Sequence, residues 1–167
     1  MSDLQIGESF VGDGAEAAHI NTVLGSRPGP AGTAWATALA TPSAGHTPFM
    51  AVLRPGLPVQ PPTLFVNKAA IANDKHGTMT WGPAQAGVAA GVADAVADGV
   101  ITATEHLVLI AAVWVNPEAA DADAVYRNNR EATKSALIAG ATGQPTVDQV
   151  LAAKDEPFNP FYRPGTV

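Results

Sequence analysis

The sequence predicts an α/β (α+β) domain in which helices cover a mixed β-sheet as a two-layer sandwich. Two strand-like segments come before any helix-like segment, whereas a parallel doubly wound fold alternates strands and helices strictly. A continuous apolar run, HLVLIAAVWV at residues 106–115, is typical of a central strand that is buried on both faces. The order of segments along the 167 residues is β-β-α-β-β-α-β-α, which favours a mixed sheet over a parallel one.

The first two strands are predicted at residues 4–12 and 16–24, joined by the turn GDGA. Side chains alternate between the two faces of a strand. One face of the second strand therefore carries the polar side chains of His19 and Asn21, next to Ala17 and Val23. The opposite face is expected to pack against helices and carries Ala18, Ile20, Thr22 and Leu24.

A helix and two further strands are predicted next. The helix begins at Pro30, because proline suits the first turn of a helix, and it runs to about Ala40. A short buried strand at residues 49–53 and the proline-rich connection RPGLPVQPP lead to a strand at residues 63–71. In this strand Lys68 shares a face with apolar neighbours, which indicates either a functional amine or a stem that reaches water at the strand end.

Two further helices are predicted, one before and one after the central strand in the sequence. The first spans residues 81–101, with Pro83 near its start and valines that recur at every fourth position. Gln85 lies in its first turn, where backbone N–H groups are unpaired. The second spans residues 116–140, with a proline near its start and Gly140 near its end.

The composition favours an assembly of several chains. Only 14% of the residues are charged, compared with roughly 25% in an average soluble domain, so much of the surface lacks solubilising groups. We therefore expect a homo-oligomer, and the alternative is an Ala- and Gly-rich monomer with a bland surface. The domain is expected at residues 1–141, and the Pro-rich residues 142–167 form a C-terminal extension, either an arm over a neighbour or a mobile tail.

Charge and hydropathy argue against several classes of function. The net charge is −6 and no basic run exists, so we do not expect binding to nucleic acid. No apolar stretch of about 18 residues predicts a transmembrane helix, and the start MSDLQIGESF does not resemble a signal peptide. Cysteine is absent, which excludes disulfides and thiolate metal sites. We expect a cytoplasmic protein that does not bind membranes.

Few residues carry obvious chemistry. No phosphate-binding loop or serine nucleophile motif occurs, and the four histidines lack the spacing of metal ligands, so we expect no metal site. The remaining candidates are His19 and Asn21 on one strand, Lys68 on another, and Gln85 at a helix start. Histidine is well suited to proton transfer near neutral pH. By residue type and spacing alone, however, a hydrogen-bonded structural histidine is the favoured interpretation of His19.

Several segments, in order along the chain, resemble the formaldehyde-activating enzyme family. They include VGDGAEAAHIN, LRPGLPVQPPTL, GPAQ and EATK, and the resemblance runs without large gaps from about Gly7 to about Ala139. Membership implies a fold like the second domain of ribosomal protein S5 and a homopentamer. It also implies the condensation of formaldehyde with tetrahydromethanopterin, a reduced pterin, to the methylene adduct and water, without a metal.

The resemblance also implies roles for individual residues. The family's catalytic histidine, in an Ala-His-Ile-Asp sequence, corresponds to His19, the expected general acid for loss of water from the carbinolamine. The expected substrate-binding positions are Asn21, Met50, Lys68, Ala70 and Gln85.

This chain departs from the family pattern at some positions. Asn21 replaces an aspartate, Ala70 replaces a threonine, and Asn128, Asn129 and Arg130 replace a Tyr-Asn-Tyr sequence. Two alternatives therefore stay open: a non-catalytic paralogue that binds a pterin or formaldehyde, and an enzyme that uses another carrier such as tetrahydrofolate.

Overall fold

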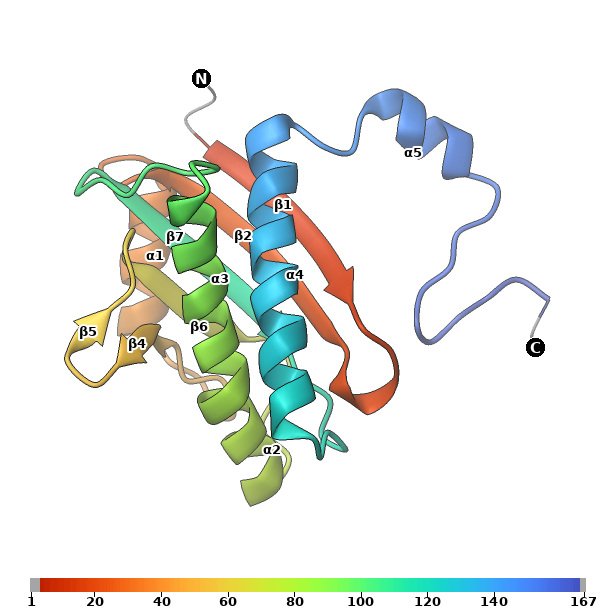
Figure 1. The fold of residues 1–167 in the computed structure, drawn as a ribbon, viewed down its shortest axis with the longest axis horizontal. Helices are drawn as coiled ribbons and strands as arrows, with labels where there is room; N and C mark the ends of the chain where they lie inside the picture. The colour runs from red at the N-terminus through yellow and green to blue at the C-terminus, as the bar shows by residue number, and fades with distance from the viewer. Residues whose placement is uncertain (1–3, 166–167) are drawn as a thin grey trace.

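A five-stranded mixed sheet forms the centre of the computed structural model, which describes residues 4–165 (Figure 1). Only the neighbours β6 and β7 are parallel, and the other neighbouring pairs are antiparallel, so the predicted mixed sheet is confirmed. The predicted central strand is also confirmed as β7. The order across the sheet is β1 (Leu4–Val11), β2 (Ala18–Ser26), β7 (Leu107–Trp114), β6 (Thr63–Asn67) and β3 (Phe49–Met50).

Two helices cover one face of the sheet, and a third lies on the opposite face (Figure 1). The pair on the covered face is α3 (Gln85–Ala97) and α4 (Ala122–Thr142). Helix α1 (Pro30–Ala40) has the predicted bounds and contacts β2 and β7. The two-layer prediction therefore omits a partial third layer, which forms because the short loop after β2 returns α1 directly onto the sheet. No helix in the described part of the chain is both long enough and apolar enough to span a bilayer.

The helix before β7 begins earlier than predicted. Helix α2 (Asp74–Met79) leads through a π-helical segment, η2 (Thr80–Ala84), directly into α3. Its start is capped by Asn73, whose side-chain oxygen accepts a hydrogen bond of 2.9 Å from the backbone N–H of His76. Pro83 therefore lies inside the helical segment, where the wider π turn accommodates a residue without an N–H. Gln85 is not in a first turn, because its N–H bonds to carbonyls of η2.

Other boundaries also differ from the predictions. The predicted strand at 49–53 is divided between β3 and a small hairpin of β4 (Val52–Arg54) and β5 (Leu57–Pro58). The strand predicted at 63–71 ends at Asn67, and the last long helix begins after Asp121, whose side chain caps it. Two short helices complete the chain: the 3-10 turn η1 (Gly14–Glu16) and α5 (Val147–Ala153).

The C-terminal segment is exposed along its length and contains α5, which begins with a capping box of Thr146 and Gln149. In Figure 1, α5 lies apart from the sheet and its covering helices. Residues 1–3 of the predicted domain and residues 166–167 of the predicted C-terminal extension lie outside the described residues.

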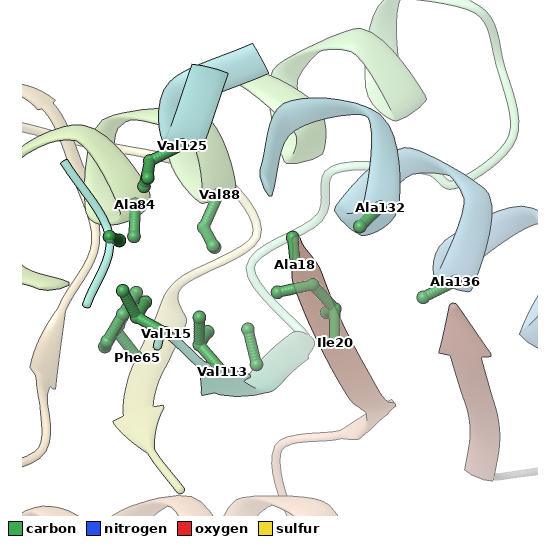
Figure 2. Close-up of a cluster of buried hydrophobic side chains, with 12 residues drawn as sticks. Ala18, Ile20, Phe65, Ala84, Val88, Val113, Val115, Val125, Ala132 and Ala136 are labelled. Carbon is green, nitrogen blue, oxygen red and sulfur yellow. The ribbon is translucent and has the colours of Figure 1, made fainter. Parts of the chain in front are cut away.

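The main core lies between the sheet and the helices α3 and α4 (Figure 2). Ile20 of β2, Phe65 of β6 and Val113 of β7 face Val88 of α3, as the alternation in β2 predicts. Helix α4 approaches β1 closely because residue 7 is glycine: a Cβ at Gly7 would lie 1.8 Å from the carbonyl oxygen of Ala136. The opposite side chains of β2, including those of His19 and Asn21, therefore point away from this core.

Candidate active site

The sheet brings three of the predicted site residues together on its open face. His19 and Asn21 are two residues apart on β2, and His19 pairs in register with Trp114 of the neighbouring strand β7. Lys68 extends β6 along the other side of β7, and its backbone N–H donates a hydrogen bond of 2.7 Å to the carbonyl of Val113. The side chain of Lys68 therefore meets those of His19 and Asn21 across β7, although they are 49 and 47 residues apart in sequence.

Both ring nitrogens of His19 have charged neighbours. Nε2 lies 2.9 Å from Oε1 of Glu8, which comes from β1, and Nδ1 lies 3.1 Å from Nζ of Lys68. The Lys68 amine also donates a hydrogen bond of 2.8 Å to Oδ1 of Asn21. A neutral ring that carries its hydrogen on Nε2 satisfies both contacts, because it donates to Glu8 and accepts from the Lys68 ammonium.

The surroundings weaken the charged forms of both basic groups. Burial lowers the pKa of His19 below its usual value, and the neighbouring Lys68 lowers it further, while Glu8 acts in the opposite direction. Burial lowers the pKa of Lys68 to about 8, although Glu8 opposes this shift too. Both side chains therefore hold their protons less tightly than free histidine and lysine side chains do.

A cavity of about 1210 Å³ opens above these side chains. Its floor is formed by the sheet residues Glu8, His19, Asn21, Lys68 and Trp114, and further walls come from the turn after β1. The C-terminal segment 158–163 lies over the cavity, where the ring of Phe161 meets that of Trp114 edge to face at 6.0 Å. Aromatic surfaces and hydrogen-bonding groups together suit a flat, polar ligand.

A family model, described as formaldehyde-activating enzyme, matches residues 6–162, which include the cavity floor and all but the last residue of the segment over it. The chain belongs to the formaldehyde-activating enzyme family. A relative called 5,6,7,8-tetrahydromethanopterin hydro-lyase, from Methanosarcina barkeri, is 44% identical over 158 residues, which are 93% of this chain and 89% of the relative.

Longer relatives carry the same region. A protein called bifunctional enzyme Fae/Hps from Methanosphaera stadtmanae is 44% identical over 96% of this chain, and one from Archaeoglobus fulgidus is 42% identical over 95%. The aligned region covers 40% and 41% of those proteins. The chain thus spans about two fifths of the length of these bifunctional relatives.

The other three residues that the family resemblance implicates do not line the cavity of this chain. Met50 lies in the edge strand β3, and Ala70 is exposed in the loop after β6. Gln85 is buried below β4, where its Oε1 accepts a hydrogen bond of 2.5 Å from the N–H of Val52. A small hollow between Thr47, Phe49 and Trp81 also opens on the β3 side of the molecule. A single chain therefore assembles half of the expected site.

Two of the other histidines have structural roles. His76 is buried, and its ring accepts from the N–H of Ala72 and lies 3.0 Å from the carbonyl of Val115. His46 bonds to the carbonyl of Asn67 at 2.9 Å. His106 is exposed next to Glu105. Among residues 4–165, no three His, Asp or Glu side chains gather in a way that would hold a metal ion.

Sequence reasoning missed Glu8, Trp114 and the aromatic residues of the tail. Glu8 carried a usable signal, because an acidic residue in a predicted strand must face away from the core. The GDGA turn joins this strand to the next as a hairpin, which places Glu8 directly opposite Asn21. No comparable signal places Phe161 near Trp114, because their contact depends on the course of the C-terminal segment over the sheet.

Proposed function

We propose that this chain catalyses the condensation of formaldehyde with tetrahydromethanopterin to the methylene adduct and water. The name of the Methanosarcina relative, 5,6,7,8-tetrahydromethanopterin hydro-lyase, supports the carrier and the release of water. The observation that carries the proposal is the placement of His19, in a chain of this family, between a carboxylate and an amine at the floor of a large cavity. The corresponding reaction class is that of a lyase, of the carbon-nitrogen lyase or hydro-lyase type.

In this mechanism His19 acts as the general acid. An amine of the pterin adds to formaldehyde and gives a carbinolamine, whose hydroxyl leaves as water only when it receives a proton. The imidazolium of His19 supplies that proton, and the second amine of the carrier then closes the methylene bridge. Formaldehyde adds to amines in water unaided, so positioning the carrier and donating one proton suffice without a metal.

The residues around the cavity fit a reduced pterin. Phe10 and Trp114 offer flat apolar surfaces for the ring system, and Asn21 supplies an amide group that can both donate and accept hydrogen bonds. Lys68 supplies a cation for any negatively charged part of the carrier.

We propose that a second copy of the chain completes the site. Met50, Ala70 and Gln85 would then contact the carrier from the β3 side of a neighbouring chain, in the homopentamer that the family resemblance implies. Exposed apolar side chains on that side, Leu53 and Trp81 among them, support an interface there. The same proposal includes three further points. The fold is like that of the second domain of ribosomal protein S5, and the protein is cytoplasmic. The domain ends at residue 141, and the C-terminal extension begins at residue 142.

A different carrier is the second candidate function. Asn21 has no negative charge and Ala70 has no hydroxyl, so a ligand that depends on those groups would bind differently. Tetrahydrofolate, which has the same pair of reacting amines, is the carrier to compare. A non-catalytic paralogue that binds a pterin or formaldehyde is the third outcome of the comparison.

The test is the rate of formaldehyde condensation above the uncatalysed background, with tetrahydromethanopterin and tetrahydrofolate in parallel. His19→Ala should lower the catalysed rate by roughly a hundredfold to ten-thousandfold, the usual contribution of a positioned general acid. His106→Ala is the control, because His106 is exposed and does not line the cavity. Full activity of His19→Ala would overturn the role of His19, and no acceleration with either carrier would favour the binding paralogue.

A further inference from the structure

Among residues 4–165, no carboxylate forms an ion pair with the amine of Lys68, as one usually does to keep a lysine charged. It is half-buried, and its hydrogen-bonding partners are the amide oxygen of Asn21 and the imidazole of His19, both uncharged. The carboxylate of Glu8 contacts Nε2 of His19 instead. The other charged groups of the cavity are Asp13, from the turn after β1, and Arg163, from the C-terminal segment.

We propose that Lys68 captures formaldehyde covalently and passes the one-carbon unit to the carrier amine. The inference rests on the proposed function for its substrate, and it gives Lys68 a catalytic role in place of the purely binding role that the family resemblance implies. The geometry that supports it is an uncharged acceptor at 2.8 Å, a proton-accepting imidazole at 3.1 Å, and an opening to the cavity.

Each step balances in atoms and charge. Lys68 passes a proton to Nδ1 of His19, which leaves a neutral amine beside an imidazolium. The nitrogen lone pair attacks formaldehyde, and the amine proton moves to the alkoxide to give the Lys68 carbinolamine. The imidazolium then protonates the hydroxyl, the C–O bond breaks, and water leaves an iminium on Nζ. A carrier amine adds to this iminium, its proton passes to Nζ, and the bond between carbon and Nζ breaks to release neutral Lys68 and an iminium on the carrier. The second amine of the carrier attacks this iminium and closes the bridge with release of a proton.

The environment of Lys68 makes the neutral amine accessible. With a pKa of about 8, roughly a tenth of the Lys68 side chains are uncharged at pH 7. An ordinary lysine is uncharged in only about one molecule in 3,000 at that pH. Asn21 maintains this state, because a carboxylate at the same position would form an ion pair with the ammonium and raise its pKa.

The experiment traps the iminium in the absence of any carrier. The purified protein is incubated at pH 7 with isotopically labelled formaldehyde and cyanoborohydride, which reduces an iminium to a stable methylamine, and the labelled lysines are mapped by peptide mass spectrometry. The sequence has four lysines, so three serve as internal references: Lys75, Lys134 and Lys154. Lys75 is exposed, and the other two form ion pairs with Asp98 and Asp155.

Lys68 should be methylated at least about tenfold faster than Lys75 at pH 7, and the difference should shrink as the pH rises and ordinary lysines lose their protons. Asn21→Asp should slow the labelling of Lys68 towards that of Lys75. Gln149→Glu, which adds the same charge on the exposed helix α5, should leave it unchanged. Near-ultraviolet circular dichroism checks that each variant is folded. Equal labelling of Lys68 and Lys75, or an unchanged rate in Asn21→Asp, would overturn the inference.

The trapping assay tests capture by Lys68, and the condensation assay tests the proposed function, so either can give a negative result without the other. Fast labelling of Lys68 without accelerated condensation supports capture by the lysine and rejects the proposed function. Accelerated condensation without preferential labelling rejects capture and leaves His19 acting on the carrier's own carbinolamine. A chase experiment tests whether the captured carbon is passed on. Labelled formaldehyde held on Lys68 should move to an added carrier amine before cyanoborohydride is introduced.

Discussion

Glu8 and Lys68 surround the ring of His19 with charges of opposite sign. The carboxylate favours the imidazolium, whereas the ammonium and the burial of the ring disfavour it. The net effect is a pKa below the usual histidine value, so the acid form of His19 increases as the pH falls through the slightly acidic range. A reaction step limited by this acid should therefore become faster in the same direction.

Glu8→Gln should move the pH profile of kcat/KM to lower pH. The substitution removes the negative charge that raises the pKa of His19, so less imidazolium is present at any given pH. The measurement is kcat/KM for the condensation between about pH 5 and pH 9. Glu131→Gln makes the same change of charge at an exposed position of α4 and should keep the original profile. Superimposable profiles for Glu8→Gln and the unmodified chain would show that Glu8 does not tune His19.

At the scale of the elements, glycines allow α3 and α4 to pack closely. Gly87 and Gly91 lie one turn apart on α3, and a Cβ at either position would come within 2.5 Å of a backbone oxygen of α4. Arg130 of α4 reinforces the contact through two hydrogen bonds to Asp94 of α3, of 2.6 Å and 2.8 Å. Arg130, which departs from the family pattern, therefore joins α3 and α4 on the covered face of the sheet, away from the cavity.

Gly91→Ala should lower the free energy of unfolding by about 1–3 kcal/mol, the usual cost of overpacking a tight contact. The added methyl group would lie 2.4 Å from the carbonyl oxygen of Arg130, and this backbone atom cannot turn away as a flexible side chain can. Urea unfolding measures the difference. Gly82→Ala is the comparison variant, because no atom lies within 4 Å of the added Cβ apart from its chain neighbours and the helix's own backbone, and it should lose less stability than Gly91→Ala. Equal stability of the two variants would mean that α3 and α4 can separate without cost.

Local signals predicted the elements well, and non-local contacts account for most of the differences. The bounds of α1 follow from Pro30 and the loops around it, and the alternation in β2 correctly separates Ile20 from His19. The start of α2 was missed because Gly77 and two threonines weaken the helical pattern, and Pro83 is a stronger start signal than the Asn73 cap. Sequence spacing also could not separate Gln85 from the cavity, because that position depends on how β4 packs over α3.

At the scale of the whole molecule, the expected site residues fall into two groups, one that lines the cavity and one that does not. His19, Asn21 and Lys68 face the cavity, whereas Met50, Ala70 and Gln85 lie outside it. Both groups can contact one carrier molecule only if the cavity of one chain faces the β3 side of another.

Mixing two variants, each altered in one of the two groups, should therefore raise the rate of condensation. When His19→Ala and Gln85→Ala chains are unfolded together and refolded, some interfaces combine an intact His19 with an intact Gln85 from the neighbour. Condensation should rise above that of either variant refolded alone, and native mass spectrometry should show assemblies of the 17.0 kDa chain that contain both variants. Mixed assemblies without any gain in rate would place both residues in the site of a single chain.

The order of strands in the sheet determines when, during synthesis, Lys68 acquires its reactive environment. Strand β7 is inserted between β2 and β6, and Thr22 pairs with Ala111, which is 89 residues further along the chain. Pairings between such distant segments form slowly, because the chain must lose the entropy of closing a long loop before these contacts stabilise it. Until residues 107–114 are synthesised and inserted, nothing holds Lys68 next to His19 and Asn21. A growing chain on the ribosome therefore carries an ordinary, charged lysine at position 68, which reacts with formaldehyde no faster than Lys75 until the fold is complete.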